Sequence, residues 1–211
     1  MKRIIANFSL LIIMSQLCFS KSISVPTGES KPVSTIFVRP NTNKWLLYQT
    51  DTSKIAASRL ILPGKSIGKT VINQKMSVVF KKLGNPSSSD ASMGGHTMCT
   101  WYSKPKIKGN DTIINETNIY FYTKNFGEAN AVALVDHIRV TSPYFKTSIH
   151  IGVGTNLEKI QNKYPAAILQ SSDSDPKTGK IIDNYYDEKK GIAFDIMDRK
   201  CVAITVYRIE N

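Results

Sequence analysis

The feature that most constrains the fold is a series of short strand-like runs along the chain. Within 131–141, Val132, Leu134, Ile138 and Val140 alternate with other residues, which is the period-2 pattern of a strand with one buried face. Turn-forming Gly, Pro, Asp and Ser residues separate the runs. Further strands are expected at 34–38, 45–49, 58–64, 99–103, 113–123, 166–170, 181–186, 191–197 and 201–208. The pattern predicts an antiparallel sheet that ends in a C-terminal meander.

Two segments instead have helical periodicity. Residues 73–83 place apolar side chains at i, i+3, i+4 and i+7, the spacing of one helical face. Asn73 is expected to cap this helix, because its side chain can accept a free backbone N–H. A second helix is expected at 156–163, where Thr155 and Glu158 fit a capping box. The predicted fold class is therefore α+β, an antiparallel sheet with two short helices.

The order of these elements allows two interpretations of the domain organisation. A Gly-containing turn, a short helix and antiparallel strands follow one another twice, at about 58–143 and 144–211. This order fits a tandem duplicated helix-plus-sheet unit, although the same pattern also recurs by chance. The polar segment 21–33 carries Pro and Gly and is expected to be a flexible lead-in. Residues 34–211 are then expected to form a single globular domain.

The N-terminus has the pattern of a secretory signal peptide over residues 1–20. Lys2 and Arg3 precede the apolar stretch 8–19, and small residues precede a cleavage point after Ser20. The apolar stretch is shorter than the roughly 20 residues of a spanning helix. We therefore expect an exported chain, periplasmic or secreted, that does not span the membrane after cleavage. Loss of Lys2 and Arg3 lowers the formal net charge from +12 to +10.

Several short motifs between Arg59 and Arg208 together carry a resemblance to known proteins. They lie at 63–68, 83–86, 90–94, 100–104, 138–143, 145–147, 152–155 and 191–194. With these motifs the chain resembles a group of exported, Bacteroidetes-like bacterial proteins of unknown function. The segment 79–86 followed by Trp101-Tyr102 is also similar, more distantly, to the small lipoprotein of the barrel-assembly machinery and to the β-lactamase inhibitor protein. This second resemblance implies a helix-on-sheet fold and a role in binding other proteins.

Signal cleavage leaves two cysteines, Cys99 and Cys201, in strand-like runs. An oxidising compartment favours a disulfide between them. Two separate buried thiols are the alternative, since free cysteine is often buried. The absence of a Cys-x-x-Cys motif argues against a thiol oxidoreductase or a zinc ribbon.

Sequence patterns of known enzymes and nucleotide-binding proteins are missing. There is no Gly-x-Ser-x-Gly elbow and no His-Glu-x-x-His pair. The segment 64–70 is one residue short of a phosphate-binding loop. Lysines are spread along the chain rather than clustered between aromatic residues, which argues against nucleic-acid binding. No cofactor and no metal are predicted, and the balance favours a protein that is not an enzyme.

The candidate binding surface consists of Met93, His96, Trp101 and Tyr102. Neighbouring strand residues face opposite sides, so Trp101 and Tyr102 should lie one in the core and one in solvent. Aromatic residues and Met are enriched at binding patches. We therefore predict a non-enzymatic module that binds another envelope protein or a cell-wall component. The alternative is a secreted hydrolase with a site near His96.

Overall fold

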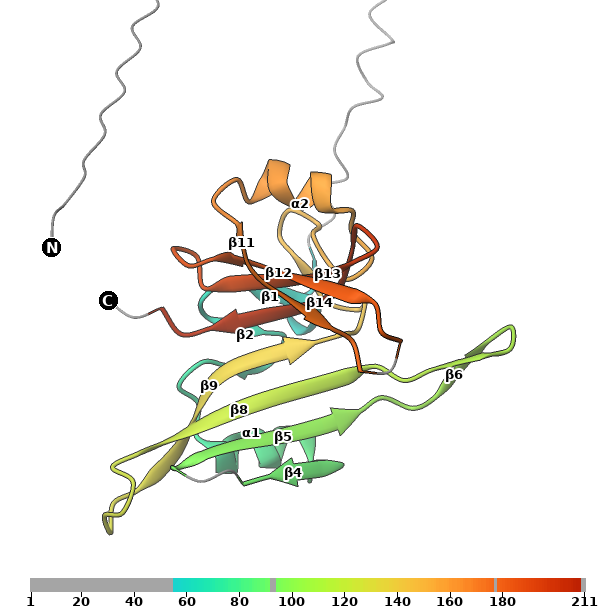
Figure 1. Cartoon of the computed structure of the whole chain (residues 1–211). Coiled ribbons are helices and arrows are strands. Elements are labelled where there is room, and N and C mark those ends of the chain that lie inside the picture. The colour runs from blue at the N-terminus through green and yellow to red at the C-terminus, as the bar shows by residue number, and fades with distance from the viewer. Residues whose placement is uncertain (1–54, 92–93, 177, 210–211) are drawn as a thin grey trace, which may run out of the picture. The chain divides into compact units, whose positions relative to one another are not determined.

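The computed structural model describes residues 55–91, 94–176 and 178–209, which are organised around one large antiparallel sheet (Figure 1). The expected signal peptide, lead-in and strands at 34–38 and 45–49 lie outside these residues. No helix in the described part is long and apolar enough to cross a membrane. The elements are η3 (Ala57–Arg59), β1 (Leu60–Leu62), β2 (Ser66–Ile67), β3 (Thr70–Val71), α1 (Met76–Leu83), β4 (Ser88–Asp90), β5 (His96–Tyr102), β6 (Lys106–Lys108), β7 (Asp111–Ile113), β8 (Glu116–Lys124), β9 (Val132–Val140), β10 (Lys146–Thr147), α2 (Leu157–Lys163), β11 (Ile168–Ser174), β12 (Ile181–Asp187), β13 (Ile192–Met197) and β14 (Lys200–Tyr207).

The large sheet has eight strands in the order β11-β12-β13-β14-β9-β8-β5-β4. Its centre is the antiparallel pair β14–β9, in which Val206 lies opposite Ile138. This pair joins the C-terminal meander to strands that lie more than 60 residues earlier in the sequence. A small sheet has the order β10-β1-β2-β3, and β6 and β7 form a separate hairpin that extends from β5 and β8.

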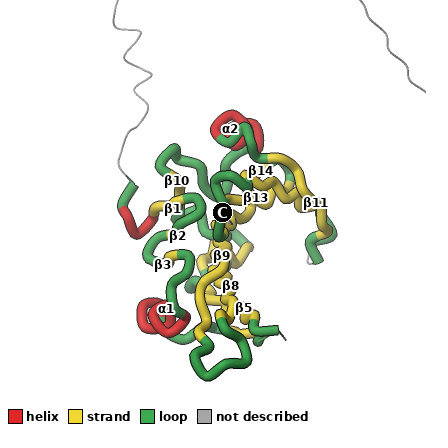
Figure 2. Tube along the Cα trace, turned by 90° about the vertical axis from the view of Figure 1, so that its left-hand side faces the viewer, coloured by secondary structure: helices red, strands yellow, loops and turns green. Residues whose placement is uncertain are grey.

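The two faces of the large sheet have different surroundings (Figure 2). Both helices and the small sheet pack on one face and form a single core with it. Alternation along the strands directs apolar side chains to this face. The largest fully buried side chains are Phe121, Phe194, Ile61, Ile119, Ile138, Ile151, Ile160, Ile192, Ile204, Val79, Val135 and Val140. No described helix covers the opposite face, which we call the open face.

Helix α1 is held on the sheet by aromatic contacts. The Phe80 ring makes edge-to-face contacts with Trp101 and Phe121, at centroid distances of 5.8 and 6.4 Å. The Trp101 indole N–H also donates a hydrogen bond of 3.2 Å to the carbonyl of Gly84, at the helix C-terminus. The prediction that Asn73 caps α1 is wrong. Asn73 lies three residues before the helix with a φ of 63°, and its Oδ1 accepts a hydrogen bond from the Tyr122 hydroxyl.

Helix α2 begins without the expected capping box. Asn156 occupies the N-cap position and makes no side-chain capping bond. The Thr155 hydroxyl instead accepts a hydrogen bond from the Gly152 N–H, and Glu158 forms a 2.7 Å ion pair with Arg199. Local polar partners outside the helix therefore replace the two reciprocal bonds of the box.

The predicted fold class, α+β with a tandem duplicated helix-plus-sheet unit, is wrong. The described part is β-rich, because one eight-stranded sheet dominates it and the two helices have only eight and seven residues. The sequence pattern gave the helices too much weight, since each is only about two turns long. The expected boundaries at 58–143 and 144–211 stay a prediction. Both sheets contain strands from either side of the boundary.

Candidate functional site

The structure does not gather the predicted binding surface into one patch. His96 and Tyr102 lie at opposite ends of β5, six residues and therefore about 20 Å apart. Trp101 points to the core face, where it anchors α1, whereas Tyr102 is 52% exposed. The predicted alternation of Trp101 and Tyr102 is thus confirmed. Met93 lies outside the described residues.

Of the two alternatives for Cys99 and Cys201, a disulfide or two separate buried thiols, the structure has the second, because both thiols are free and buried. Cys99 lies on β5 and Cys201 on β14, with β8 and β9 between these strands. Three strand spacings of about 4.8 Å place the two strands about 14 Å apart, beyond the span of a disulfide. Burial raises the pKa of both thiols above the ordinary value, and the Cys201 S–H donates to the carbonyl of Ala203.

Three adjoining hollows lie on the open face and form the candidate site. We name them the histidine hollow, the central hollow and the tyrosine hollow, of ≈ 220, ≈ 380 and ≈ 410 Å³ respectively. The histidine hollow is lined by Asp90, His96, Thr97, Met98, Tyr120, Phe121, Asp136 and His137. The central hollow is lined by Tyr120, His137, Arg139, Ser171, Asp173, Asn184, Tyr186, Asp195, Thr205 and Tyr207. The tyrosine hollow is lined by Asp136, Tyr186, Glu188, Tyr207, Arg208 and Ile209.

A β-bulge shapes the histidine hollow. Tyr120 pairs with His137, whereas the next residue of β8 pairs with Val135, so Asp136 is the additional residue of β9. The His137 ring stacks on Tyr120 at a centroid distance of 3.9 Å, and its Nδ1 lies 3.1 Å from Asp136 Oδ2. Burial lowers the pKa of His137, against the opposing effect of the Asp136 carboxylate. His137 is therefore neutral at pH 7, which leaves it able to accept a proton.

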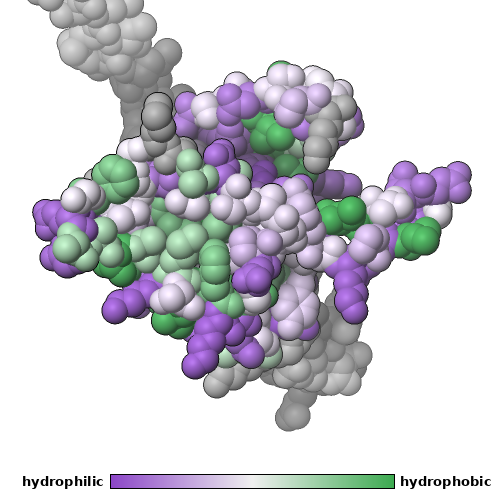
Figure 3. Space-filling view, turned by 90° about the horizontal axis from the view of Figure 1, so that it is seen from below, coloured by the Kyte–Doolittle hydropathy of each residue, from purple (hydrophilic) through white to green (hydrophobic). Residues whose placement is uncertain are grey.

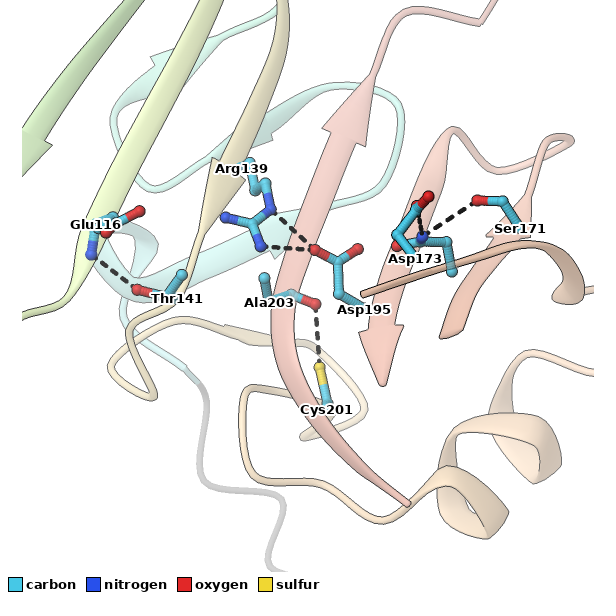
Figure 4. A network of polar contacts seen from close by, with 9 residues as sticks. Glu116, Arg139, Thr141, Ser171, Asp173, Asp195, Cys201 and Ala203 are labelled. Carbon is cyan, nitrogen blue, oxygen red and sulfur yellow. Dashed lines mark hydrogen bonds and ion pairs between the residues drawn. The ribbon is translucent and has the colours of Figure 1, made fainter. Parts of the chain in front are cut away.

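The central hollow contains an ion pair between Arg139 and Asp195. Figure 4 shows Arg139 of β9 and Asp195 of β13 pointing toward each other, and Asp195 Oδ2 lies 2.9 Å from Nε and 2.8 Å from Nη2 of Arg139. Beside this pair, the Asn184 amide donates to Ser171 and Asp173. These bonds fix the polar groups of the hollow in place, so a ligand would meet an ordered surface.

Two tyrosines form a wall of the tyrosine hollow. The rings of Tyr186 and Tyr207 lie 5.9 Å apart with an interplanar angle of 46°. Burial raises the pKa of Tyr207 to about 12, and the Glu188 carboxylate adds to this rise. The Arg208 guanidinium lies 4.6 Å over the ring of Tyr122 and is therefore stacked on the protein's own surface.

The side chains of the open face suit the binding of a partner better than the binding of a cofactor. Within the described ranges, no group of three or more His, Cys, Asp or Glu side chains is placed to hold a metal ion. Three tyrosines and two arginines are among the lining residues, and these residue types carry much of the energy of protein interfaces. Of the predicted site residues that the structure describes, only His96 lines one of the three hollows. The tyrosines were missed, although each occupies the outward position of an alternating strand.

A second exposed feature is the β6–β7 hairpin, which projects from the sheet (Figure 3). Ile107 is 82% exposed, and Ile113 and Ile114 are also exposed. Lys106 and Lys108 flank Ile107, so apolar and basic side chains alternate along this arm. The hairpin lies outside the three hollows.

Comparison with protein families and with curated proteins gives no match to the chain. Among solved structures, the chain is similar to a cysteine-rich secretory protein of Staphylococcus aureus, with 13% identity and a TM-score of 0.40 over 72% of this chain and 49% of that one. It is also similar to an extracellular protein with an SCP domain from Bacillus anthracis, with 12% identity and a TM-score of 0.36 over 65% and 44% of the two chains. The chain thus spans about half the length of either protein. Likenesses this weak carry no argument about its function.

Proposed function

We propose that the chain is an exported, non-enzymatic binding module whose open face docks a partner protein of the cell envelope. The observation that carries the proposal is the row of adjoining hollows, lined by Tyr120, Tyr186, Tyr207, Arg139 and Arg208. Export is supported by the signal-peptide pattern of residues 1–20.

The dimensions of the open face suit a protein partner. The central hollow draws residues from six neighbouring strands, β11 to β8, and these span about 24 Å at a spacing of about 4.8 Å. Seven residues of strand extend about 23 Å, so the face covers roughly 550 Å² before its curvature is included. A standard protein interface covers about 800 Å² on each partner. The two areas are of the same order.

The experiment is crosslinking of the tagged protein in its native envelope, followed by purification and mass spectrometry. Tyr186→Ala combined with Tyr207→Ala should reduce the captured partner more than tenfold, because two anchoring rings are lost. Tyr144→Ala is the matched control, since Tyr144 is an exposed tyrosine outside the three hollows. Circular dichroism establishes that all three proteins are folded.

Two results contradict a protein partner. The same yield of partner with the double variant would place the contact elsewhere. If no protein is enriched and the module sediments with purified cell wall instead, a cell-wall component is the ligand.

Hydrolysis at the histidine hollow is a second candidate function. His137 is neutral, lies 3.1 Å from Asp136 and shares the hollow with His96. A neutral imidazole beside a carboxylate can act as a general base toward water. Screening ester, peptide and glycoside substrates with the wild type and His137→Ala tests this candidate. Turnover that His137→Ala abolishes supports an enzyme, and turnover unchanged in that variant excludes this site.

A further inference from the structure

The open face carries a charge opposite to that of the whole chain. The formal net charge of the chain is +12. Five carboxylates line the three hollows against two guanidinium groups, which gives a local charge of −3 with neutral histidines. The carboxylates are those of Asp90, Asp136, Asp173, Asp195 and Glu188. A partner that docks on this face therefore meets a negative potential, and charge complementarity favours a positive group on that partner.

The negative charge meets aromatic rings in the tyrosine hollow. Tyr186 and Tyr207 line it together with the carboxylates of Glu188 and Asp136. Apart from burial, the pKa of Tyr207 is raised by Glu188 and Asp187, and that of Tyr186 by Asp195 and Asp173. Both rings therefore lie in a negative field. The faces of tyrosine rings attract cations by their quadrupole, and nearby carboxylates strengthen this attraction.

Arg208, which lines the tyrosine hollow, and Lys190, two residues after Glu188, are engaged with other groups. The Arg208 guanidinium lies over the Tyr122 ring and 3.9 Å from Asp136. Lys190 lies over the Tyr164 ring, with its Nζ 3.7 Å from Asp187. Within the described part of the chain, the buried Tyr207 hydroxyl has no hydrogen-bond partner. The hollow thus offers the surface of two rings and the carboxylates of Glu188 and Asp136.

We propose that the partner protein inserts a lysine or arginine side chain into the tyrosine hollow. This inference rests on the proposed function and names the group that the open face recognises. The apolar stem of the side chain packs against the surface formed by the contacting rings of Tyr186 and Tyr207, and its cationic end faces Glu188.

The test is an NMR titration of the intact exported protein, labelled with ¹³C in its tyrosine rings. The probes are Nα-acetyl-lysine methylamide, its arginine counterpart and the uncharged norleucine analogue. We expect the Tyr186 and Tyr207 resonances to shift and saturate with the two cationic probes but not with norleucine. Tyr186→Phe and Tyr207→Phe assign the two resonances.

Variants separate the contributions of ring, hydroxyl and charge. Tyr207→Leu should weaken lysine binding about threefold, and Tyr207→Phe should weaken it less because the ring is kept. Glu188→Gln should weaken binding by about threefold, as expected for an exposed ion pair. Glu158→Gln, an identical charge change on α2, is the control and should leave the affinity unchanged.

Three results overturn the inference. These are the absence of a shift with both cationic probes, an equal response to norleucine, and an unchanged affinity in Glu188→Gln. Tighter binding of phosphocholine than of the lysine probe would overturn a protein source and indicate a lipid headgroup. Failure of the proposed function can be distinguished from failure of this inference. In that case the lysine probe binds to the tyrosine hollow, but crosslinking captures no partner protein.

Discussion

The ion pair between Arg139 and Asp195 should stabilise the large sheet. The loss of stability on its removal measures how far solvent is excluded from the central hollow. The side chains are 26% and 13% exposed, and both nitrogens contact the same carboxylate oxygen at 2.8–2.9 Å. Removing one partner of a fully buried pair costs about 3–5 kcal/mol. Because this pair is partly exposed, we discount the cost for Arg139→Met to about 2 kcal/mol.

A double-mutant cycle separates the pair from the other effects of each substitution. Arg139→Met leaves the Asp195 carboxylate without its cation, whereas Arg139→Met with Asp195→Leu removes both charges of the pair. The double variant should therefore lose less stability than the two single variants together, with a coupling of about 1–2 kcal/mol. For a chain of this size, the loss in Arg139→Met corresponds to a decrease in Tm of about 4–8 °C.

The assay is urea unfolding at pH 7, followed by far-UV circular dichroism. Arg199→Met is the matched control, because its pair with Glu158 is 72% and 74% exposed and should contribute less than about 0.5 kcal/mol. If Arg139→Met also costs less than about 0.5 kcal/mol, solvent screens the pair and the reasoning from burial fails.

Four further outcomes are expected. Cys99 and Cys201 should be unreactive toward a thiol reagent in the folded protein. After cleavage of residues 1–20, which contain Cys18, the unfolded protein should show two thiols with or without prior reduction. Burial lowers the pKa of His137, so the free energy of unfolding should decrease as the pH falls below about 6.5, and His137→Gln should weaken this dependence. The pKa of Tyr207 is raised to about 12, so the contribution of the protonated hydroxyl to stability is complete below pH 10 and is lost as the pH rises toward 12. Absorbance at alkaline pH follows the ionisation of the tyrosines. Tyr207→Phe should remove the ionisation near pH 12. Gly191→Ala should destabilise the fold by about 3 kcal/mol or more in urea unfolding, because φ is +65° and the new Cβ would lie 2.7 Å from the carbonyl oxygen of Tyr207.

The sequence located most of the regular elements because their signals are local. The apolar stripe of 73–83 and the alternation of 131–141 correspond to α1 and β9 within a few residues. The hairpin at β6–β7 was missed, because its strands have three residues each and bury no side chain. The strand β4 was missed for the same reason, since its Ser-Ser-Asp sequence has no apolar face.

Strand order could not be predicted in the same way. The central pair β14–β9 and the parallel pair β1–β10 join segments far apart in the sequence. Alternation indicates that each strand has a buried face, but it does not say which strand lies beside it. The bulge at Asp136 is equally hidden, although it places His137 on Tyr120 and so creates the histidine hollow.

The candidate site could not be predicted for the same reason, because it depends on which strands lie side by side. On β5, alternation correctly separated Trp101 from Tyr102, yet the residues that line the hollows come from neighbouring strands. Tyr120, His137 and Tyr207 lie in register across β8, β9 and β14, although 17 and 70 residues separate them in the sequence. The sequence did contain a signal for these residues. Tyr120, His137 and Tyr207 each occupy the outward position of a strand, where a small polar residue would be sufficient for folding.

The net charge shows most clearly why the candidate site could not be predicted from the sequence alone. A formal net charge of +12, taken alone, favours a basic surface and an attraction to anionic material. A sum of charges over the chain does not say where the charges lie. The fold places Asp136, Asp173, Asp195 and Glu188 around the three hollows of the open face. Within a Debye length of about 8 Å, a docked group responds to these nearby carboxylates more than to distant lysines. Recognition on the open face should therefore select a cation, against the sign of the whole protein.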